Sequence, residues 1–288
     1  MRWCSFTMAR NEEKYISGMI SSIRGQTIPP TRIHVVDDGS SDATGKILDA
    51  AADKDMVISH VPSHPSQILE PIFNIRQHKL MYEAAQGADY ILCLDADTTI
   101  PPDYMARMTS RMESDGVMVA GGVMQGDSYI MPAESGMAIN AAWLRSHTRL
   151  PELSLGWLGP ESVAAGHPTI AYTDIMLHYQ RPMGARYSPD MERRRGATYR
   201  MAGLPLPFII IKTIRTCSLQ SARGYFSYRG ERMPRQFRRW VTRYWIASVQ
   251  RRRGWWTRMF RRTGVGVFIL PDGYSGDQRI GKDYGSAR

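Results

Sequence analysis

The segment that decides the fold reads YILCLDAD and spans residues 90–97. Its apolar half, with Gly87 before it and Pro101 after it, is typical of a short buried strand. Asp95 and Asp97 then stand at the carboxyl end of that strand, where open α/β sheets bind ligands. Side chains at i and i+2 of a strand point the same way, so the carboxylates are expected roughly 7 Å apart. Such a pair favours a divalent cation, although an isolated pair is more often a helix cap or a solvated turn.

The first half of the sequence alternates strand and helix patterns. Strands are predicted at residues 3–8, 32–36, 56–60 and 90–94, and helices at 12–24, 40–52 and 77–86. This order predicts a mostly parallel α/β sheet with helices on both faces. From Val117 onward the alternation weakens into short strands and loops rich in glycine and proline. The predicted catalytic part is therefore concentrated in the first half of the chain.

Composition and charge narrow the class of protein. The 288 residues, 43% of them hydrophobic, are enough for one large domain with an appendage. Cys4, Cys93 and Cys217 are odd in number and widely spaced, which fits a reducing compartment rather than a disulfide framework. No apolar run reaches the roughly 20 residues that span a bilayer. The strand pattern that begins at Trp3 leaves no room for a signal peptide, so we expect a cytoplasmic protein, soluble or bound to a surface.

Two further strand ends carry polar residues. The sequence VVDDGSSD at 35–42 places Asp37 and Asp38 before a glycine turn and a helix start. A carboxylate there can accept a hydrogen bond from a nucleobase imide or a ribose hydroxyl. The alternative is that Asp42 and Ser40 simply cap the helix. The sequence ARNEE at 9–13 follows the first strand. Three strand ends with polar residues therefore predict one ligand site at one edge of the sheet.

The order and spacing of these three motifs resemble the family 2 glycosyltransferases, which have the GT-A fold. The likeness covers roughly residues 3–182. It implies that Asp95 and Asp97 hold a divalent metal, Mn²⁺ or Mg²⁺, which bridges the diphosphate of a nucleotide sugar, with Asp97 as the direct ligand. It also implies that His178, after the next strand, is a further metal ligand.

The resemblance also implies a nucleotide-binding set. The acid after the second strand contacts the base in that family, a role that matches Asp38 with Asp37 beside it. A cationic side chain such as Arg76 or Lys79 would stabilise the departing diphosphate. The residues expected to contact the nucleotide sugar are Ala9, Asn11, Glu12, Asp37, Asp38, Arg76, Lys79 and Asp95.

The catalytic base has two candidates. Family members carry an acidic pair at the start of a later helix, and residues 159–162 read GPES at the corresponding place. Ser162 stands where the second acid is expected. Glu161 takes over that role in one interpretation, and Asp174 is the alternative. Either base would serve an inverting transfer, because single displacement inverts the anomeric configuration.

The carboxyl-terminal part is strongly basic. Residues 193–262 contain nineteen Lys or Arg and one acid, so this segment carries a charge of +18. Since the net charge of the whole chain is +10, the other residues together carry −8. We expect a catalytic domain over residues 1–200 and a basic extension over 201–288. Residues 234–250 show the spacing of an amphipathic helix with Trp and Arg on its faces, which suits an anionic membrane surface. The alternative is that the apolar stripe packs on the catalytic domain. Membrane binding would make the enzyme peripheral at the inner face and its acceptor lipid-linked or a polysaccharide.

Two rival functions share these motifs. The DADTT sequence at 95–99 also fits the D-x-D-x-T signature of haloacid-dehalogenase-like phosphatases, but that fold carries the motif on its first strand. A non-catalytic protein that binds membrane or nucleic acid, built on a decayed GT-A domain, would explain Ser162. Intact Asp38, Asp95 and Asp97 argue against such decay, and no nucleic-acid motif accompanies the basic segment.

Overall fold

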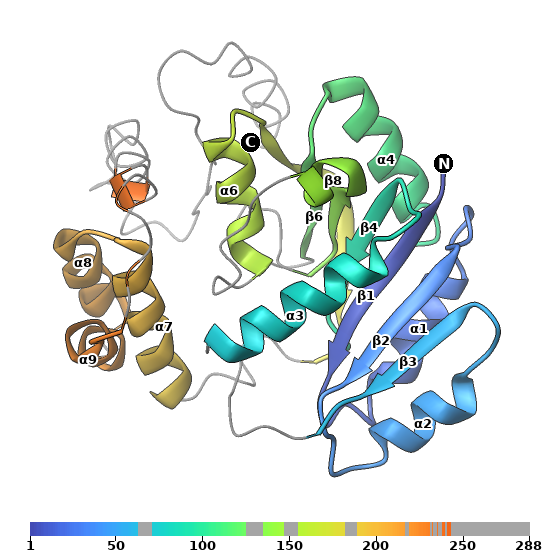
Figure 1. Cartoon of the computed structure of the whole chain (residues 1–288), viewed down its shortest axis with the longest axis horizontal. Coiled ribbons are helices and arrows are strands. Elements are labelled where there is room, and N and C mark those ends of the chain that lie inside the picture. Colours follow the sequence, from blue (N-terminus) through green and yellow to red (C-terminus); the bar gives the residue numbers. More distant parts are fainter. Residues whose placement is uncertain are drawn as a thin grey trace.

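The computed structural model describes an α/β sheet domain and a group of three helices beside it (Figure 1). The described residues are 1–62, 71–124, 135–146, 155–181, 189–216, 219–230, 232, 235, 238–239 and 241–242. Cys217 and most of the predicted helix at 234–250 lie outside them. Within the described residues, no helix has the length and apolar character needed to cross a membrane.

The sheet has eight strands in the order β3-β2-β1-β4-β7-β6-β8-β5. Their bounds are β1 Trp3–Ala9, β2 Arg32–Asp37, β3 Met56–His60, β4 Tyr90–Cys93, β5 Thr98–Thr99, β6 Val119–Met124, β7 Met137–Asn140 and β8 Thr169–Tyr179. All strands run in one direction except β7 and β5, which are antiparallel to their neighbours. The predicted mostly parallel sheet is confirmed. The carboxyl ends of β1, β2, β4 and β8 therefore point toward the same edge.

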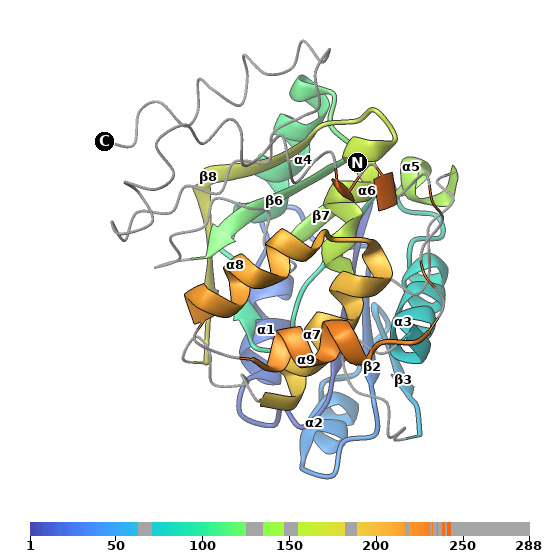
Figure 2. The same cartoon turned by 90° about the vertical axis from the view of Figure 1, so that its left-hand side faces the viewer.

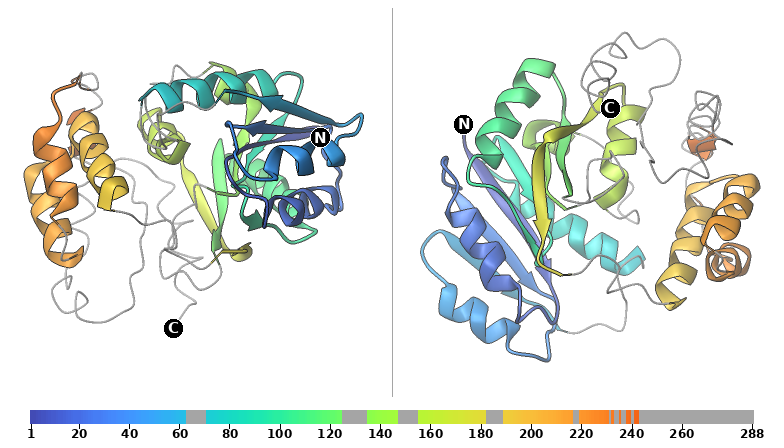
Figure 3. Two further views of the ribbon diagram at one scale, coloured as in Figure 1. Left: turned by 90° about the horizontal axis from the view of Figure 1, so that it is seen from below. Right: turned by 180° about the vertical axis from the view of Figure 1, so that it is seen from behind.

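Helices cover both faces of the sheet (Figures 1 and 3). One face packs against α1 (Ile16–Arg24), α2 (Thr44–Ala51) and α4 (Tyr104–Asp115). The other packs against α3 (Pro71–Ala84), α5 (Ala141–Ser146) and α6 (Leu158–Ala164), which a 3₁₀ turn at Leu155–Trp157 precedes. The predicted helices at 12–24 and 77–86 correspond to α1 and α3, whose first residues differ from the predicted ones. α1 begins only at Ile16, because the residues before it form a turn bound to the β2–α2 loop.

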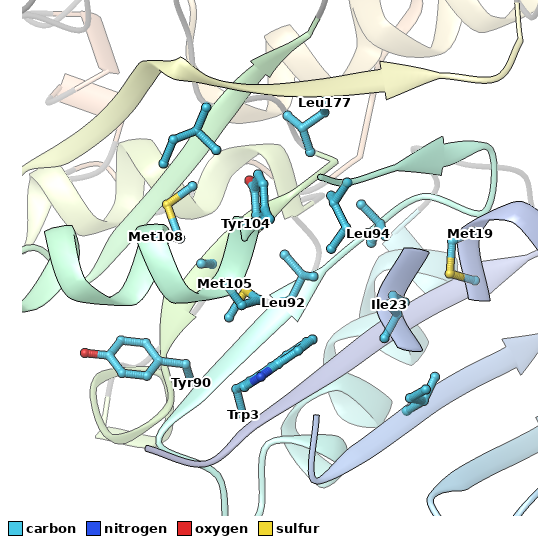
Figure 4. Packing of buried hydrophobic residues seen from close by; sticks show 14 of the residues in the cluster. Trp3, Met19, Ile23, Tyr90, Leu92, Leu94, Tyr104, Met105, Met108 and Leu177 are labelled. Carbon is cyan, nitrogen blue, oxygen red and sulfur yellow. The ribbon is translucent and has the colours of Figure 1, made fainter. Parts of the chain in front are cut away.

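The larger core lies between β1, β4 and the helices on the α1 and α4 side (Figure 4). Trp3, Leu92 and Tyr104 are fully buried there. Full burial of a leucine side chain such as that of Leu92 stabilises the fold by about 1.5–3 kcal/mol. Tyr104 also donates a hydrogen bond to the Gly136 carbonyl and accepts one of 3.0 Å from the Gly122 amide. Those bonds connect the first residue of α4 to strand β6 and to the residue before β7.

The helical group consists of α7 (Pro189–Ala202), α8 (Leu206–Thr216) and α9 (Gln220–Ser227), shown from another side in Figure 2. Helices α7 and α9 touch through their backbones at two glycines. A Cβ atom on Gly196 would lie 1.9 Å from the Ser221 carbonyl oxygen, and one on Gly224 would lie 1.7 Å from that of Arg193. No larger residue fits at either position without separating the helices. The domain boundary predicted between residues 200 and 201 would fall inside α7, and it stays a prediction.

Candidate active site at the carboxyl edge of the sheet

The three sequence motifs lie at neighbouring strand ends. β1 pairs in parallel with β2 up to Ala9 opposite Asp37, and with β4 up to Phe6 opposite Cys93. The backbone contacts continue past the strands, because the Asp38 amide donates to the Ala9 carbonyl at 2.8 Å. The convergence expected from the alternating pattern is therefore present in the structure.

The loops after β1 and β2 are bound to each other. Asn11 has a φ of 56°, a left-handed conformation that asparagine tolerates better than most residues. Its side-chain oxygen accepts a 2.8 Å hydrogen bond from the Ser41 amide, and its own amide donates to Ser40 Oγ at 3.0 Å. One residue on, the Glu12 amide donates to Thr44 Oγ1 at 2.7 Å. Together these bonds hold the ARNEE segment rigidly beside Asp37 and Asp38.

Both carboxylate oxygens of Asp37 have partners within the protein. Oδ1 accepts from the Ser40 amide at 3.0 Å, and Oδ2 lies 3.0 Å from His60 Nδ1. The other ring nitrogen of His60 lies 2.9 Å from Asp49 Oδ1. Burial raises the pKa of Asp37, but the hydrogen bonds from Ser40 and His60 outweigh it, so that the pKa falls below its usual value. Asp37 therefore shapes the loop.

Asp38 is buried beside two arginines. Its Oδ1 accepts a 2.7 Å hydrogen bond from Arg76 Nη1, and its Oδ2 lies 3.9 Å from Arg10 Nη1. Burial raises the pKa of Asp38, and the two guanidinium groups offset only part of that rise. Of the two cations predicted from α3, Arg76 reaches the site. The Lys79 side chain is 76% exposed and lies 4.0 Å from Glu83, one turn further along the helix.

Arg181 joins the first and third motifs. Its Nη2 donates to Glu12 Oε2, and its Nε lies 3.0 Å from Asp97 Oδ2, although that N–H makes no hydrogen bond. Glu12 and Asp97 are only 2% and 7% exposed, so this guanidinium compensates two buried carboxylates. The Gln180 amide also donates to the Asp97 carbonyl at 2.8 Å. Sequence reasoning missed Arg181, whose only signal is its place just after the strand that carries His178.

The other two predicted metal ligands, Asp95 and His178, both have exposed side chains. Asp95 is exposed, and its amide donates to Ser135 Oγ at 2.9 Å. His178 is exposed on β8 and pairs with Thr99 of β5, the short strand directly after Asp97. The antiparallel pairing of β5 with β8 thus brings residues about 80 positions apart together at one strand end.

The predicted metal ligands could supply only part of the coordination shell of a divalent metal. Within the described residues there is no group of three or more His, Cys, Asp or Glu side chains that surrounds a metal position. Asp95 and Asp97 supply hard oxygen donors, and one oxygen of Asp97 already faces Arg181. Mg²⁺ and similar ions are commonly held by one or two carboxylates together with substrate phosphates and water. The donor set is therefore compatible with a metal that binds together with a diphosphate.

The two candidate bases have different surroundings. Glu161 lies in the first turn of α6 and is 4% exposed, next to the fully buried Ser162. Asp174 lies on β8 on the α4 side, where Arg107 Nη2 contacts Oδ2 at 2.7 Å and Arg111 Nη1 contacts Oδ1 at 2.5 Å. Burial raises the pKa of Asp174, but hydrogen bonds from Arg111 and Arg107 bring it below its usual value. A carboxylate held in this way is a weak base, which favours Glu161.

The His60 contacts lead to a pH prediction. Hydrogen bonds to Asp37 and then Asp49 raise the pKa of His60 above its ordinary 6.5. A group with a raised folded-state pKa contributes its full stability below its unfolded pKa and loses it as the pH rises through the folded pKa. We expect the melting temperature to decline as the pH rises above 6.5, and the His60→Asn variant to lose this decline. Melting curves of both proteins from about pH 5.5 to about pH 8.5 test it. Parallel curves for the two proteins would contradict the prediction.

The sequence comparisons agree with this geometry. Residues 6–67, which include the first two motifs, match the family model described as "Glycosyl transferase family 2". The succinoglycan biosynthesis protein ExoA of Rhizobium meliloti (strain 1021) is 29% identical over 114 residues, which are 38% of this chain. The match spans only 33% of that relative's length.

Two solved structures share the fold. The mannosyltransferase PcManGT from Pyrobaculum calidifontis, in complex with GDP-Man and Mn²⁺, has a TM-score of 0.52 at 15% identity, over 83% of this chain and 68% of its own. S. aureus TarS has a TM-score of 0.50 at 16% identity, over 80% and 44%. At these identities the likeness concerns the fold alone. The chain is therefore similar to family 2 glycosyltransferases over residues 6–67, and its sheet part has a GT-A-like fold.

Proposed function

We propose that the protein is an inverting, metal-dependent glycosyltransferase that moves a sugar from a nucleotide diphosphate sugar to an acceptor hydroxyl. The observation that carries this proposal is the carboxyl edge of the sheet, where Arg181 joins Glu12 to Asp97 and where Asp38 follows the neighbouring strand β2. A phosphatase that uses Asp95 as nucleophile finds less support, because β4 is the fourth strand of the chain rather than the first.

The nucleotide part of the donor would bind between the first two loops. Asp38 would accept an N–H from the base or a ribose hydroxyl, and Asp37 holds the loop through Ser40 and His60. Arg76, positioned by Asp38, would add positive charge for the phosphates. The backbone at Ala9, Asn11 and Glu12 would form the wall opposite Asp38.

The diphosphate would lie beside Asp95 and Asp97, and these two carboxylates would hold Mn²⁺ or Mg²⁺ together with phosphate oxygens and water. His178 stays a predicted ligand, because the described residues contain no three-residue metal group. When bound, the metal supplies positive charge to the leaving diphosphate. Glu161 would take the proton from the acceptor hydroxyl as that oxygen attacks the anomeric carbon. Attack from the face opposite the leaving group inverts the configuration. The mannosyltransferase PcManGT, which shares the fold and was solved with GDP-Man and Mn²⁺, supports a donor and a cofactor of the same classes.

The acceptor is proposed to be lipid-linked or a polysaccharide, with the protein cytoplasmic and peripheral at the inner face of the membrane. The similarity to a succinoglycan biosynthesis protein supports a role in glycan synthesis. The charge of +18 over residues 193–262 supports contact with an anionic surface. The basic extension over 201–288 would provide this contact, and the sheet domain would provide the chemistry.

A donor screen tests the proposal. UDP-, GDP- and dTDP-sugars are added with Mn²⁺, and both the melting temperature and the slow hydrolysis of each donor are recorded. We expect one nucleotide class to raise the melting temperature and to be hydrolysed, and EDTA to abolish both effects. If no sugar nucleotide stabilises the protein or is hydrolysed, the non-catalytic alternative replaces this proposal.

A further inference from the structure

A second site lies in the helical group, away from the sheet edge. A cavity of about 300 Å³ opens where the end of α7, the turn into α8, the helix α9 and the described residues of 232–242 meet. Figure 1 shows part of that last segment above α7 and α8. The lining residues are Arg200, Gly203, Leu204, Pro205, Tyr225, Arg232, Arg235, Arg238, Arg239 and Thr242. Five of these ten described residues are arginines, and none of the ten is acidic.

The cavity is held in shape by the residues of its floor. Tyr225 is 4% exposed and donates a 2.8 Å hydrogen bond to the Leu204 carbonyl, while Arg200 stacks 4.9 Å above the tyrosine ring. Thr242 Oγ1 donates to the Gly203 carbonyl at 3.1 Å, which binds the basic segment to the turn after α7. A Cβ atom on Gly203 would lie 2.6 Å from that of Arg238, so only glycine permits this approach. The arginines are thus gathered by packing.

Five guanidinium groups around one cavity repel one another unless an anion lies between them. Guanidinium groups bind phosphate oxygens through paired N–H donors, and such bonds are stronger than those between neutral groups. The hydroxyls of Tyr225 and Thr242 already donate to carbonyls, and Arg200 donates to the Tyr225 hydroxyl at 3.3 Å. Arg232, Arg235 and Arg239 are exposed and can turn their N–H donors toward a ligand. The cavity volume lies at the lower end of the range for small-molecule sites. The chemistry therefore fits a phosphate group.

An apolar stripe begins directly beside this cavity. Leu206 follows the lining residue Pro205, and Ile210 and Ile214 lie one and two turns further along the same face of α8. Their side chains are 45%, 51% and 64% exposed. The opposite side of α8 faces α7, where the Phe208 ring lies 5.1 Å from that of Tyr199 and Lys212 Nζ lies 3.4 Å from Glu192 Oε2. Exposed branched aliphatic side chains next to a basic cavity match the interface between acyl chains and headgroups.

We propose that the arginine cavity binds the phosphate of an anionic lipid, while Leu206, Ile210 and Ile214 enter the adjacent apolar layer. This inference rests on the peripheral membrane association proposed above and names the residues that produce it. It uses none of the residues assigned to glycosyl transfer, so the two proposals fail separately.

Vesicle flotation of the full chain tests this proposal. Vesicles of phosphatidylcholine alone are compared with vesicles that also contain phosphatidic acid, whose phosphate is a monoester. The variant Arg235→Gln/Arg239→Gln removes two cavity cations, and the control Arg193→Gln/Arg223→Gln removes two exposed cations of α7 and α9 that do not line the cavity. We expect the cavity variant to bind the anionic vesicles at least about tenfold more weakly and the control to lose less than about threefold.

Two further measurements keep the outcomes distinct. Ile210→Ser/Ile214→Ser should weaken vesicle binding but leave binding of inorganic pyrophosphate, measured by calorimetry, unchanged. Donor hydrolysis should stay unchanged in every one of these variants. Equal losses in the cavity variant and the control would overturn the proposal, because that result indicates diffuse charge attraction. Pyrophosphate binding in the cavity without any vesicle binding would also overturn it, in favour of a soluble phosphorylated ligand.

Discussion

Replacing Asp97 by asparagine is expected to lower donor turnover by roughly 10²- to 10³-fold, the usual cost of removing one charge-stabilising group from an active site. Asparagine keeps the volume of the side chain but removes its negative charge. The diphosphate and its metal would then lose the buried carboxylate at the end of β4, which is 7% exposed in the structure. The measurement is the rate of nucleotide release from the donor identified in the screen, at increasing concentrations of Mn²⁺.

The dependence on Mn²⁺ separates binding from folding. The variant should need a higher Mn²⁺ concentration to reach its lower maximal rate. The matched control is Asp103→Asn, which removes an exposed acid that lies 3.5 Å from Arg107 at the start of α4. That change should leave the turnover within about twofold, as expected for an exposed ion pair. If Asp97→Asn retained both the parental rate and the parental Mn²⁺ dependence, Asp97 would not be a ligand.

Replacing Arg181 by methionine is expected to destabilise the protein by about 3 kcal/mol, because it leaves Glu12 and Asp97 buried without their shared cation. For a domain of this size, such a loss lowers the melting temperature by roughly 6–12 °C. Methionine keeps the apolar length of the side chain, so the effect reports the charge. The measurement is thermal unfolding followed by circular dichroism.

Two comparisons isolate the role of the buried carboxylates. The double variant Arg181→Met/Glu12→Gln should recover part of the stability, since it removes one of the two uncompensated charges. Arg2→Met breaks an exposed pair with Asp89 at 3.4 Å and should cost less than about 1 kcal/mol. A loss no larger for Arg181→Met than for Arg2→Met would mean that water reaches both acids and that the guanidinium does not hold the site together.

Much of the sheet edge was predictable from the sequence. The strand at 90–94 and the acids after it follow from an apolar run with fixed boundaries, and the observed strand is Tyr90–Cys93. The strand predicted at 56–60 matches β3 (Met56–His60). Local patterns suffice here because parallel strands that alternate with helices bring all their carboxyl ends to one edge.

Other features depended on contacts between distant segments. No local pattern indicates that Arg181 compensates Glu12 and Asp97, since the residues lie 169 and 84 positions apart. The late start of α1 follows from hydrogen bonds to Ser40 and Thr44 on another loop. Asp174 had the right residue type for a base, but Arg107 and Arg111 of α4 already hold its carboxylate.

The sequence by itself determined the four parallel strands of the first half, the edge at which a ligand site is expected, and the acids of the Asp95-Ala96-Asp97 motif, because all three depend on short-range periodicity and chain order. Only the tertiary structure decided which side chains compensate those acids and which basic residues surround a cavity. Burial and charge pairing are set by neighbours that lie far apart in the sequence. A carboxylate at a strand end is visible in the sequence, whereas its partner is known only once the chain has folded.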